Sequence, residues 1–245
     1  MKPSFKPKIS LQIQALAYDR ALRNRRPLFA MHQVVNADDK SWHTERVWTA
    51  VGSETVALER AQKYAGSVHV STELPTLNEY SAADCDDSSY TSGAQVMTRL
   101  SSTRTNGEVR KRDLDIAHPL VTLATLPLFV AENWERLLSG EDIPASYLVL
   151  KVQRTATVDL RWVPNHTQGA HVAVTPRNWL LRAIFGSTRL YTQGNQPVFL
   201  RQEGLLDPRD LRPNGRWKEY LGTLEFETPW DLRSLCAKES GNELA

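Results

Sequence analysis

The sequence predicts a mainly β protein of the α+β kind. It favours one large curved antiparallel sheet or open half-barrel, with two or three short helices packed on the concave face. About ten segments alternate apolar and polar residues, which is the period of a half-buried strand. Turns separate most of these segments, whereas parallel strands would need a crossover helix between them. Helical spacing occurs in only two or three stretches, so the helices cover the sheet and do not alternate with its strands.

The first part of the chain predicts a run of strands joined by turns. Residues 9–17 place Ile9, Leu11 and Ile13 on one face, with polar residues between them. Segment 54–63 fits a strand or a helix, and the short turns on either side favour a strand. Asn106-Gly107 predicts a type I′ hairpin turn, because both residues tolerate positive φ. The other strands expected in this part cover 28–35, 42–51, 95–100 and 108–116.

Residues 74–93 predict a long polar connection, because Pro75, Gly93 and several acidic residues interrupt any regular pattern. Asp84, Asp86 and Asp87 could form a calcium loop. They lack the glycine and the terminal glutamate of an EF-hand, so a solvated loop is the plainer interpretation. Long loops often carry function, and the segment therefore stays a candidate site.

A helix is expected from Pro127 to Leu138. Proline suits its first turn, where the missing N–H is not needed, and Gly140 ends it. Its apolar face comprises residues three and four positions apart: Phe129, Val130, Asn133, Trp134, Leu137 and Leu138.

The second half predicts further strands and two short helices. Thr175 and Pro176 predict the start of a helix that Gly186 ends, and Thr228-Pro229 predicts a cap for a terminal helix. Pro208 and Pro213 predict a loop over 204–215. The strands expected here cover 147–154, 157–163, 171–174, 189–192, 198–202 and 220–226.

Composition narrows the class of protein. The chain has 245 residues and a net charge of +2, and this near-balance of charge does not indicate nucleic-acid binding. We expect one β-rich domain over 1–245, with flexible ends at 1–8 and 238–245. No run approaches the ~20 apolar residues of a membrane span. The polar start of the chain lacks the apolar core of a signal peptide, so the protein is cytoplasmic as written, or periplasmic if an export signal was removed.

Metal and cofactor motifs are not evident in the sequence. Cys85 and Cys236 have no CxxC spacing, although they could pair, and the six histidines form no ligand-like cluster. Glycine-rich phosphate loops are absent. We therefore expect neither a metal nor a cofactor.

Candidate ligand-binding residues lie on the apolar faces. Trp134, Trp162 and Trp179 fit either the core or the lining of a cavity between helices and sheet. Arg154 is in phase with Leu148, which points it towards the concave side. There it could pair with Glu203 or Asp159, lie at an exposed strand end, or bind a carboxylate or phosphate head group bidentately.

The central segment also resembles a family of uncharacterised bacterial proteins. The matching positions are Phe129, Trp134, Leu137, Gly140, Tyr147 and Arg154, followed by Glu203-Gly204 and the closing strand 220–226. The similarity extends over about 42–226. It implies a shape like the open half-barrels of lipoprotein-carrier proteins, whose concave face holds an acyl chain. Family members usually carry an export signal and a Ser-Asn after the Glu-Gly pair, where this chain has Leu206-Asp207.

The sequence thus predicts a protein that binds a hydrophobic or amphipathic small molecule in a cavity between a curved sheet and covering helices. A cofactor-free cyclase or isomerase using the same cavity is the first alternative, and it requires an acid or base with a perturbed pKa in the pocket. A structural or assembly subunit is the second, and it requires a large exposed apolar surface. The predicted ligand-binding residues are Trp134, Tyr147, Arg154, Trp162, Trp179 and Glu203.

Overall fold

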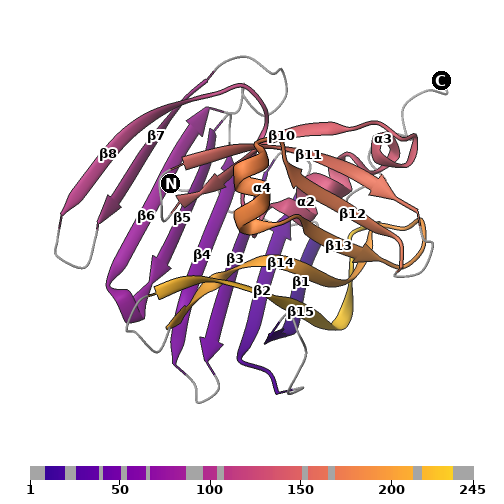
Figure 1. Cartoon of the computed structure of the whole chain (residues 1–245), viewed down its shortest axis with the longest axis horizontal. Helices are drawn as coiled ribbons and strands as arrows, with labels where there is room; N and C mark the ends of the chain where they lie inside the picture. The colour runs from indigo at the N-terminus through magenta and orange to yellow at the C-terminus, as the bar shows by residue number, and fades with distance from the viewer. Residues whose placement is uncertain are drawn as a thin grey trace.

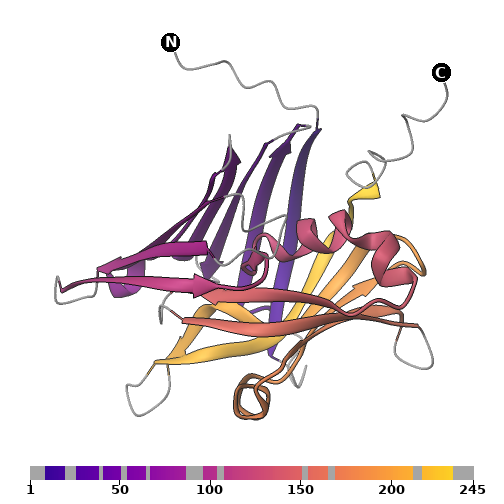
Figure 2. The same cartoon turned by 90° about the horizontal axis from the view of Figure 1, so that it is seen from above.

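In the part of the chain that the structure describes, the protein is built on one curved, unclosed sheet of fifteen strands, with three short α-helices (Figures 1 and 2). The computed structural model describes residues 9–19, 26–38, 41–50, 54–64, 67–86, 96–103, 108–150, 154–164, 169–211 and 217–233. The predicted fold class, a mainly β protein with a large curved antiparallel sheet, is confirmed.

The first eight strands form an N-terminal arm in which each strand pairs antiparallel with the next along the chain. All six strands expected here are present, including the ambiguous segment, which is β4. The strands of this arm are β1 (Ile9–Asp19), β2 (Phe29–Ala37), β3 (Trp42–Ala50), β4 (Thr55–Tyr64), β5 (Ser67–Leu74), β6 (Glu79–Asp86), β7 (Val96–Thr103) and β8 (Val109–Ile116).

The remaining strands form a C-terminal arm, which joins the first arm where β15 pairs with β1. All its pairs are antiparallel except β9 with β10, which is parallel. The strands of this arm are β9 (Leu120–Val121), β10 (Ile143–Val149), β11 (Arg154–Val163), β12 (His171–Pro176), β13 (Thr188–Thr192), β14 (Val198–Leu211) and β15 (Trp217–Asp231).

The curvature of the sheet follows from its connectivity. Strands β8 and β9 lie at opposite edges of the sheet, yet only residues 117–119 separate them in the chain. Four residue steps from Ile116 to Leu120 span at most roughly 14 Å. The two edges must therefore approach each other at one end, which bends the sheet around an interior (Figure 2).

Two helices lie inside this curve and one lies outside. Helices α2 (Leu126–Glu132) and α3 (Trp134–Leu138) follow β9 and pack between the arms, whereas α4 (Trp179–Phe185) stands on the other side of the C-terminal arm (Figure 2). A short 3-10 helix, η1 (Pro75–Leu77), connects β5 to β6.

The prediction of one continuous helix to Leu138 is wrong, because α2 and α3 are separated at Asn133. The side-chain amide of Asn133 donates to the carbonyl of Phe129 at 2.9 Å, where it competes with the backbone. Its own φ of −109° and ψ of 19° are not helical. Gly140 follows α3 with a φ of +90°, as expected for a residue that ends a helix.

Two segments that were expected to be irregular are strands. The predicted loop 74–93 contains β6, which pairs with β5 and β7 on its two sides, so sheet pairing outweighs the low strand preference of its aspartates. The predicted loop after Gly204 is the second half of β14. Its Pro208 lies at a register shift between Leu206 and Arg209, where no ladder hydrogen bond is lost.

Two predicted helix starts are also wrong. Pro176 is the last residue of β12, and α4 begins after Asn178, whose side chain accepts hydrogen bonds from the amides of Leu180 and Leu181 at 2.9 and 3.3 Å. Thr228 and Pro229 lie within β15, in a stretch bulged out between the partners of Phe199 and Arg201. The Asn106-Gly107 turn, Cys236 and the two chain ends lie outside the described residues.

The core of the C-terminal arm contains a chain of aromatic rings. Trp134 of α3 packs edge-on against Trp162 of β11 and Phe199 of β14, with ring centroids 5.2 and 6.5 Å apart. Phe199 in turn contacts Trp230, which contacts Phe226. These contacts fix α3 against the sheet and so hold the preceding segment 122–125 over the interior.

Candidate functional site

A row of polar side chains crosses the inner face of the N-terminal arm. Gln33 of β2, Arg46 of β3, Glu59 of β4 and Thr72 of β5 are directly opposed, strand to strand. Opposed residues share a face of the sheet. Gln33 and Arg46 have no exposed surface, and Glu59 is 2% exposed. A polar row at this depth is costly unless its groups find partners.

Arg46 is held from two sides. Its Nε donates to Gln33 Oε1 at 2.8 Å, and its Nη1 lies 3.6 Å from Asp207 Oδ2. Gln33 is oriented in turn, because its Nε2 donates to Thr44 Oγ1 at 2.6 Å and to the carbonyl of Ala124 at 3.1 Å. Among the described residues, Nη1 and Nη2 of Arg46 have no hydrogen-bond partner. The guanidinium is therefore fixed, but its hydrogen-bonding capacity is not exhausted.

Asp207 comes from the other arm. It lies on β14, the strand whose second half extends towards β4. Its Oδ2 accepts a hydrogen bond from Trp48 Nε1 at 2.9 Å, beside its ion pair with Arg46. The length of β14 thus brings a carboxylate from the C-terminal arm to the polar row. The prolines in this part of the sequence predict a loop instead of this strand.

Glu59 is the residue of this polar row with a strongly shifted pKa. The amide of Ala124 donates to its Oε1 at 3.4 Å, while its Oε2 has no hydrogen-bond partner among the described residues. The pKa of Glu59 is raised from 4.5 to about 8, by burial first and by the negative charge of Asp207 second, against the opposing effects of Arg46, Thr122 and Ala124. Glu59 is therefore protonated and neutral at pH 7, so it can donate a hydrogen bond.

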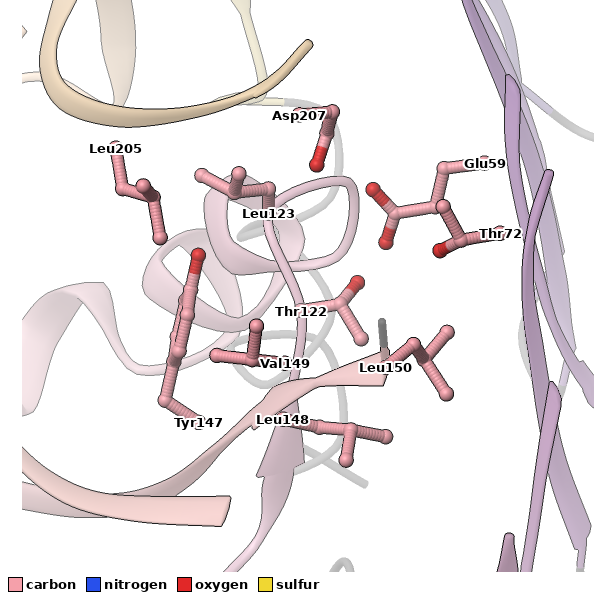
Figure 3. A pocket seen from close by; sticks show the side chains of 10 residues that line it. All are labelled: Glu59, Thr72, Thr122, Leu123, Tyr147, Leu148, Val149, Leu150, Leu205 and Asp207. Atoms are coloured by element: carbon pink, nitrogen blue, oxygen red, sulfur yellow. The ribbon is translucent and has the colours of Figure 1, made fainter. Parts of the chain in front are cut away.

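A pocket lies beside Glu59, between β4, the end of β10 and residues 122–125, which we call the covering segment (Figure 3). Its cavity is about 30 Å³, which is room for one or two groups the size of water. The carboxyl groups of Glu59 and Asp207 both point into it in Figure 3. Its oxygen-bearing lining residues are Glu59, Thr72, Thr122, Tyr147 and Asp207.

The rest of the pocket wall is aliphatic. Leu123 comes from the covering segment, Leu205 from β14, and the other side chains from β10 and the residue after it (Figure 3). The pocket thus joins an apolar wall to a small group of oxygens, which is the usual composition of a small-molecule site. The aliphatic lining residues are Leu123, Leu148, Val149, Leu150 and Leu205.

Of the six predicted ligand-binding residues, the structure places only Tyr147 at this pocket. Trp134 is buried and Trp162 is partly buried, and they pack against each other in the core described above. Arg154 is the first residue of β11 and is exposed, so it lies at a strand end, one of the alternatives left open by the sequence.

The structure corrects one prediction about these residues and decides against one alternative that the sequence left open for Arg154. Trp179 does not face the interior, because its side chain is 71% exposed on α4. Glu203 does not pair with Arg154. It accepts a hydrogen bond from Tyr191 Oη at 3.0 Å and forms ion pairs with Arg189 and Arg201 at 3.6 and 3.4 Å. Glu203 thus belongs to a separate cluster on the C-terminal arm.

The residues that sequence reasoning missed are the inward-facing polar ones. Arg46 is in phase with Trp42 and Trp48, and Glu59 is in phase with Ala57 and Ala61, all of them buried. A charged residue in the apolar phase of a strand is the available signal, because the alternation itself requires it to point inwards. No comparable signal marks Asp207, whose position depends on the course of β14.

Metal ligands and membrane spans are not found in the part of the chain that the structure describes. No group of three or more His, Cys, Asp or Glu side chains within it could hold a metal ion. Asp84, one of the three residues of the suggested calcium loop, instead lies on β6, 2.7 Å from His69 Nδ1. Within the same residues, no helix has the length and apolar character needed to cross a membrane.

Comparison with known proteins adds no assignment. No protein-family model, curated protein or solved structure matches this chain. The resemblance to lipoprotein-carrier-like half-barrels therefore stays a prediction, and the geometry of the pocket carries the functional argument.

Proposed function

We propose that this protein binds a small amphipathic molecule, whose head group enters the pocket at Glu59 and whose apolar part lies against the leucines of the same pocket. The observation that carries the proposal is the state of Glu59. Its carboxyl group is buried beside a cavity, and one of its oxygens has no hydrogen-bond partner among the described residues. Buried polar atoms are nearly always paired, so an unpaired one beside a cavity favours a partner supplied by a ligand or by water.

The size of the cavity limits what it holds. Pockets that enclose whole ligands typically measure about 300–1,000 Å³. A cavity of about 30 Å³ takes a head group alone. The remainder of the molecule would leave along Leu148 and Leu150, which line the pocket at the end of β10. Occupancy by a longer chain would require the covering segment and the end of β10 to move apart.

Native mass spectrometry of the purified protein tests this proposal. We expect a population heavier than the 27.7 kDa chain by the mass of one small molecule, which denaturation releases for identification. The matched variants are Glu59→Gln, which changes the pocket, and Glu225→Gln on the exposed face of β15. Loss of the adduct in the first variant alone would support the pocket. An unliganded wild-type protein that also takes up no added amphiphile would refute the proposal.

A second candidate is a cofactor-free enzyme, and the pKa of Glu59 is the specific observation in its favour. A carboxylic acid that titrates near neutral pH can both give and take a proton, which is what a general acid–base catalyst requires. Incubation of the co-purified molecule with the protein in D₂O tests this candidate. Deuterium incorporation that wild type catalyses and Glu59→Gln does not would favour the enzyme over simple binding.

A further inference from the structure

We infer that the head group selected by this pocket is the protonated amine of an alkylamine, and not a carboxylate or a phosphate. The inference rests on the proposed function, since it names the chemical class of the molecule that the pocket binds. Three properties of the site support it: the sign of the charges that line it, the kind of hydrogen-bonding atoms that it presents, and its volume.

The charge of the lining excludes an anion. Two carboxyl groups, those of Glu59 and Asp207, line the pocket, and its described lining residues include no lysine, arginine or histidine. Arg46 is close to both, but it has no exposed surface and does not line the pocket, and its Nε donates to Gln33 while its Nη1 lies 3.6 Å from Asp207. An incoming carboxylate or phosphate would therefore meet the negative charge of Asp207 beside a neutral Glu59, with no cation among the described lining residues, which is unfavourable in a largely buried site.

The hydrogen-bonding atoms and the volume both fit an ammonium group. An alkylammonium has three donors and no acceptor. The pocket offers carboxyl oxygens from Glu59 and Asp207 and hydroxyl oxygens from Thr72 and Thr122, drawn from four different parts of the fold. A cavity of about 30 Å³ fits a group the size of water, as the ammonium is, and is too small for the four oxygens of a phosphate.

Binding of the amine would be coupled to release of a proton. In the empty protein the pKa of Glu59 is about 8, set by burial first and by Asp207 second, against the opposing effects of Arg46, Thr122 and Ala124. The phenol of Tyr147, on β10, is the other titratable group among the described lining residues. An ammonium beside Glu59 favours the carboxylate, because a buried cation needs an opposite charge. Glu59 therefore loses its proton as the amine binds.

Calorimetric titration with three compounds of equal chain length tests the inference. Octylamine, 1-octanol and octanoate share the apolar tail and differ only in the head group. We expect octylamine to bind at least tenfold more tightly than the other two at pH 8. Because an alkylamine stays charged below pH ~10, its affinity should rise roughly 50-fold between pH 6 and pH 8 as Glu59 loses its proton. Titrations in buffers of different ionisation enthalpy should show release of close to one proton at pH 6.

Glu59→Gln should weaken octylamine binding at pH 8 at least tenfold and abolish its pH dependence, while Glu225→Gln should change neither. Circular dichroism checks that the first variant folds, and proton release from wild type tests the inference without any variant. Equal or tighter binding of octanoate or octanol, or affinity for octylamine that does not change with pH, would overturn the inference and leave the proposed function standing. Failure of all three compounds to bind would count against the proposed function itself.

Discussion

Replacing Glu59 by glutamine should make the protein more stable at alkaline pH and leave its stability unchanged at acid pH. Glutamine has the shape of the protonated acid but cannot ionise. In wild type, the pKa of Glu59 is raised from 4.5 to about 8, so the folded state binds more protons than the unfolded state between these values. The contribution of Glu59 to the free energy of unfolding of wild type should therefore be largest below pH 4.5, and it should fall as the pH rises to about 8.

The size of this effect follows from the same shift. About 3.5 pKa units at about 1.4 kcal/mol each correspond to a loss on the order of 5 kcal/mol across this pH window. Chemical denaturation at pH 5, 6, 7, 8 and 9 measures it as the difference between wild type and Glu59→Gln. That difference should grow by a few kcal/mol from pH 5 to pH 8 and then level off, whereas Glu225→Gln should follow wild type. A difference that does not change with pH would refute the assignment of Glu59 as a buried neutral acid.

Three further predictions concern stability and can be measured by denaturant titration. Trp134→Ala should cost about 3–5 kcal/mol because Trp134 is 3% exposed, while Trp179→Ala should cost less than about 1 kcal/mol because its ring is 71% exposed; equal costs would contradict the placement of α4. Gly204→Ala should lower the free energy of unfolding more than Gly194→Ala, although both glycines have positive φ. A Cβ at Gly204 would lie 2.9 Å from a backbone atom of β13, whereas a Cβ at Gly194 would have no atom within 4 Å. Arg46→Met should cost about 3–5 kcal/mol by leaving the carboxylate of Asp207 without its ion pair, and a smaller cost would show that this pair is not buried as described.

The strands of the N-terminal arm could be predicted from the sequence because burial there follows the alternation of residues. In β2 and β3, every second residue is buried from Met31 to Ala37 and from Trp42 to Trp48. Local pattern and tertiary environment agree in these strands, so the periodicity alone identifies them. The same agreement holds at Gly140, where a positive φ ends a helix at the residue that the sequence marks.

The errors at the prolines arose where long-range pairing outweighs local preference. Pro208 and Pro229 mark a loop and a helix cap in the sequence, but both lie in strands, at register shifts between β14 and β15. Proline is tolerated there because the shifted positions need no ladder hydrogen bond. Which residues will sit at such a shift depends on the partner strand, which the local sequence does not specify.

The candidate site was the least predictable part. Its two carboxyl groups come from Glu59 on β4 and Asp207 on β14, which are far apart in the sequence and meet only because the sheet curves. Glu59 carried a signal, as a charged residue in the buried phase of its strand. The sequence places Trp134 and Trp162 either in the core or along a cavity. They pack in the core, as large aromatic residues most often do.

The most direct test of the account is a crystal structure of the protein grown with octylamine at pH 8.5. The account predicts electron density for the amine within hydrogen-bonding distance of the carboxyl groups of Glu59 and Asp207, with the alkyl chain against Leu148 and Leu150. A pocket that contains only water while octylamine binds elsewhere, or not at all, would contradict the claim that the ligand head group is held at Glu59.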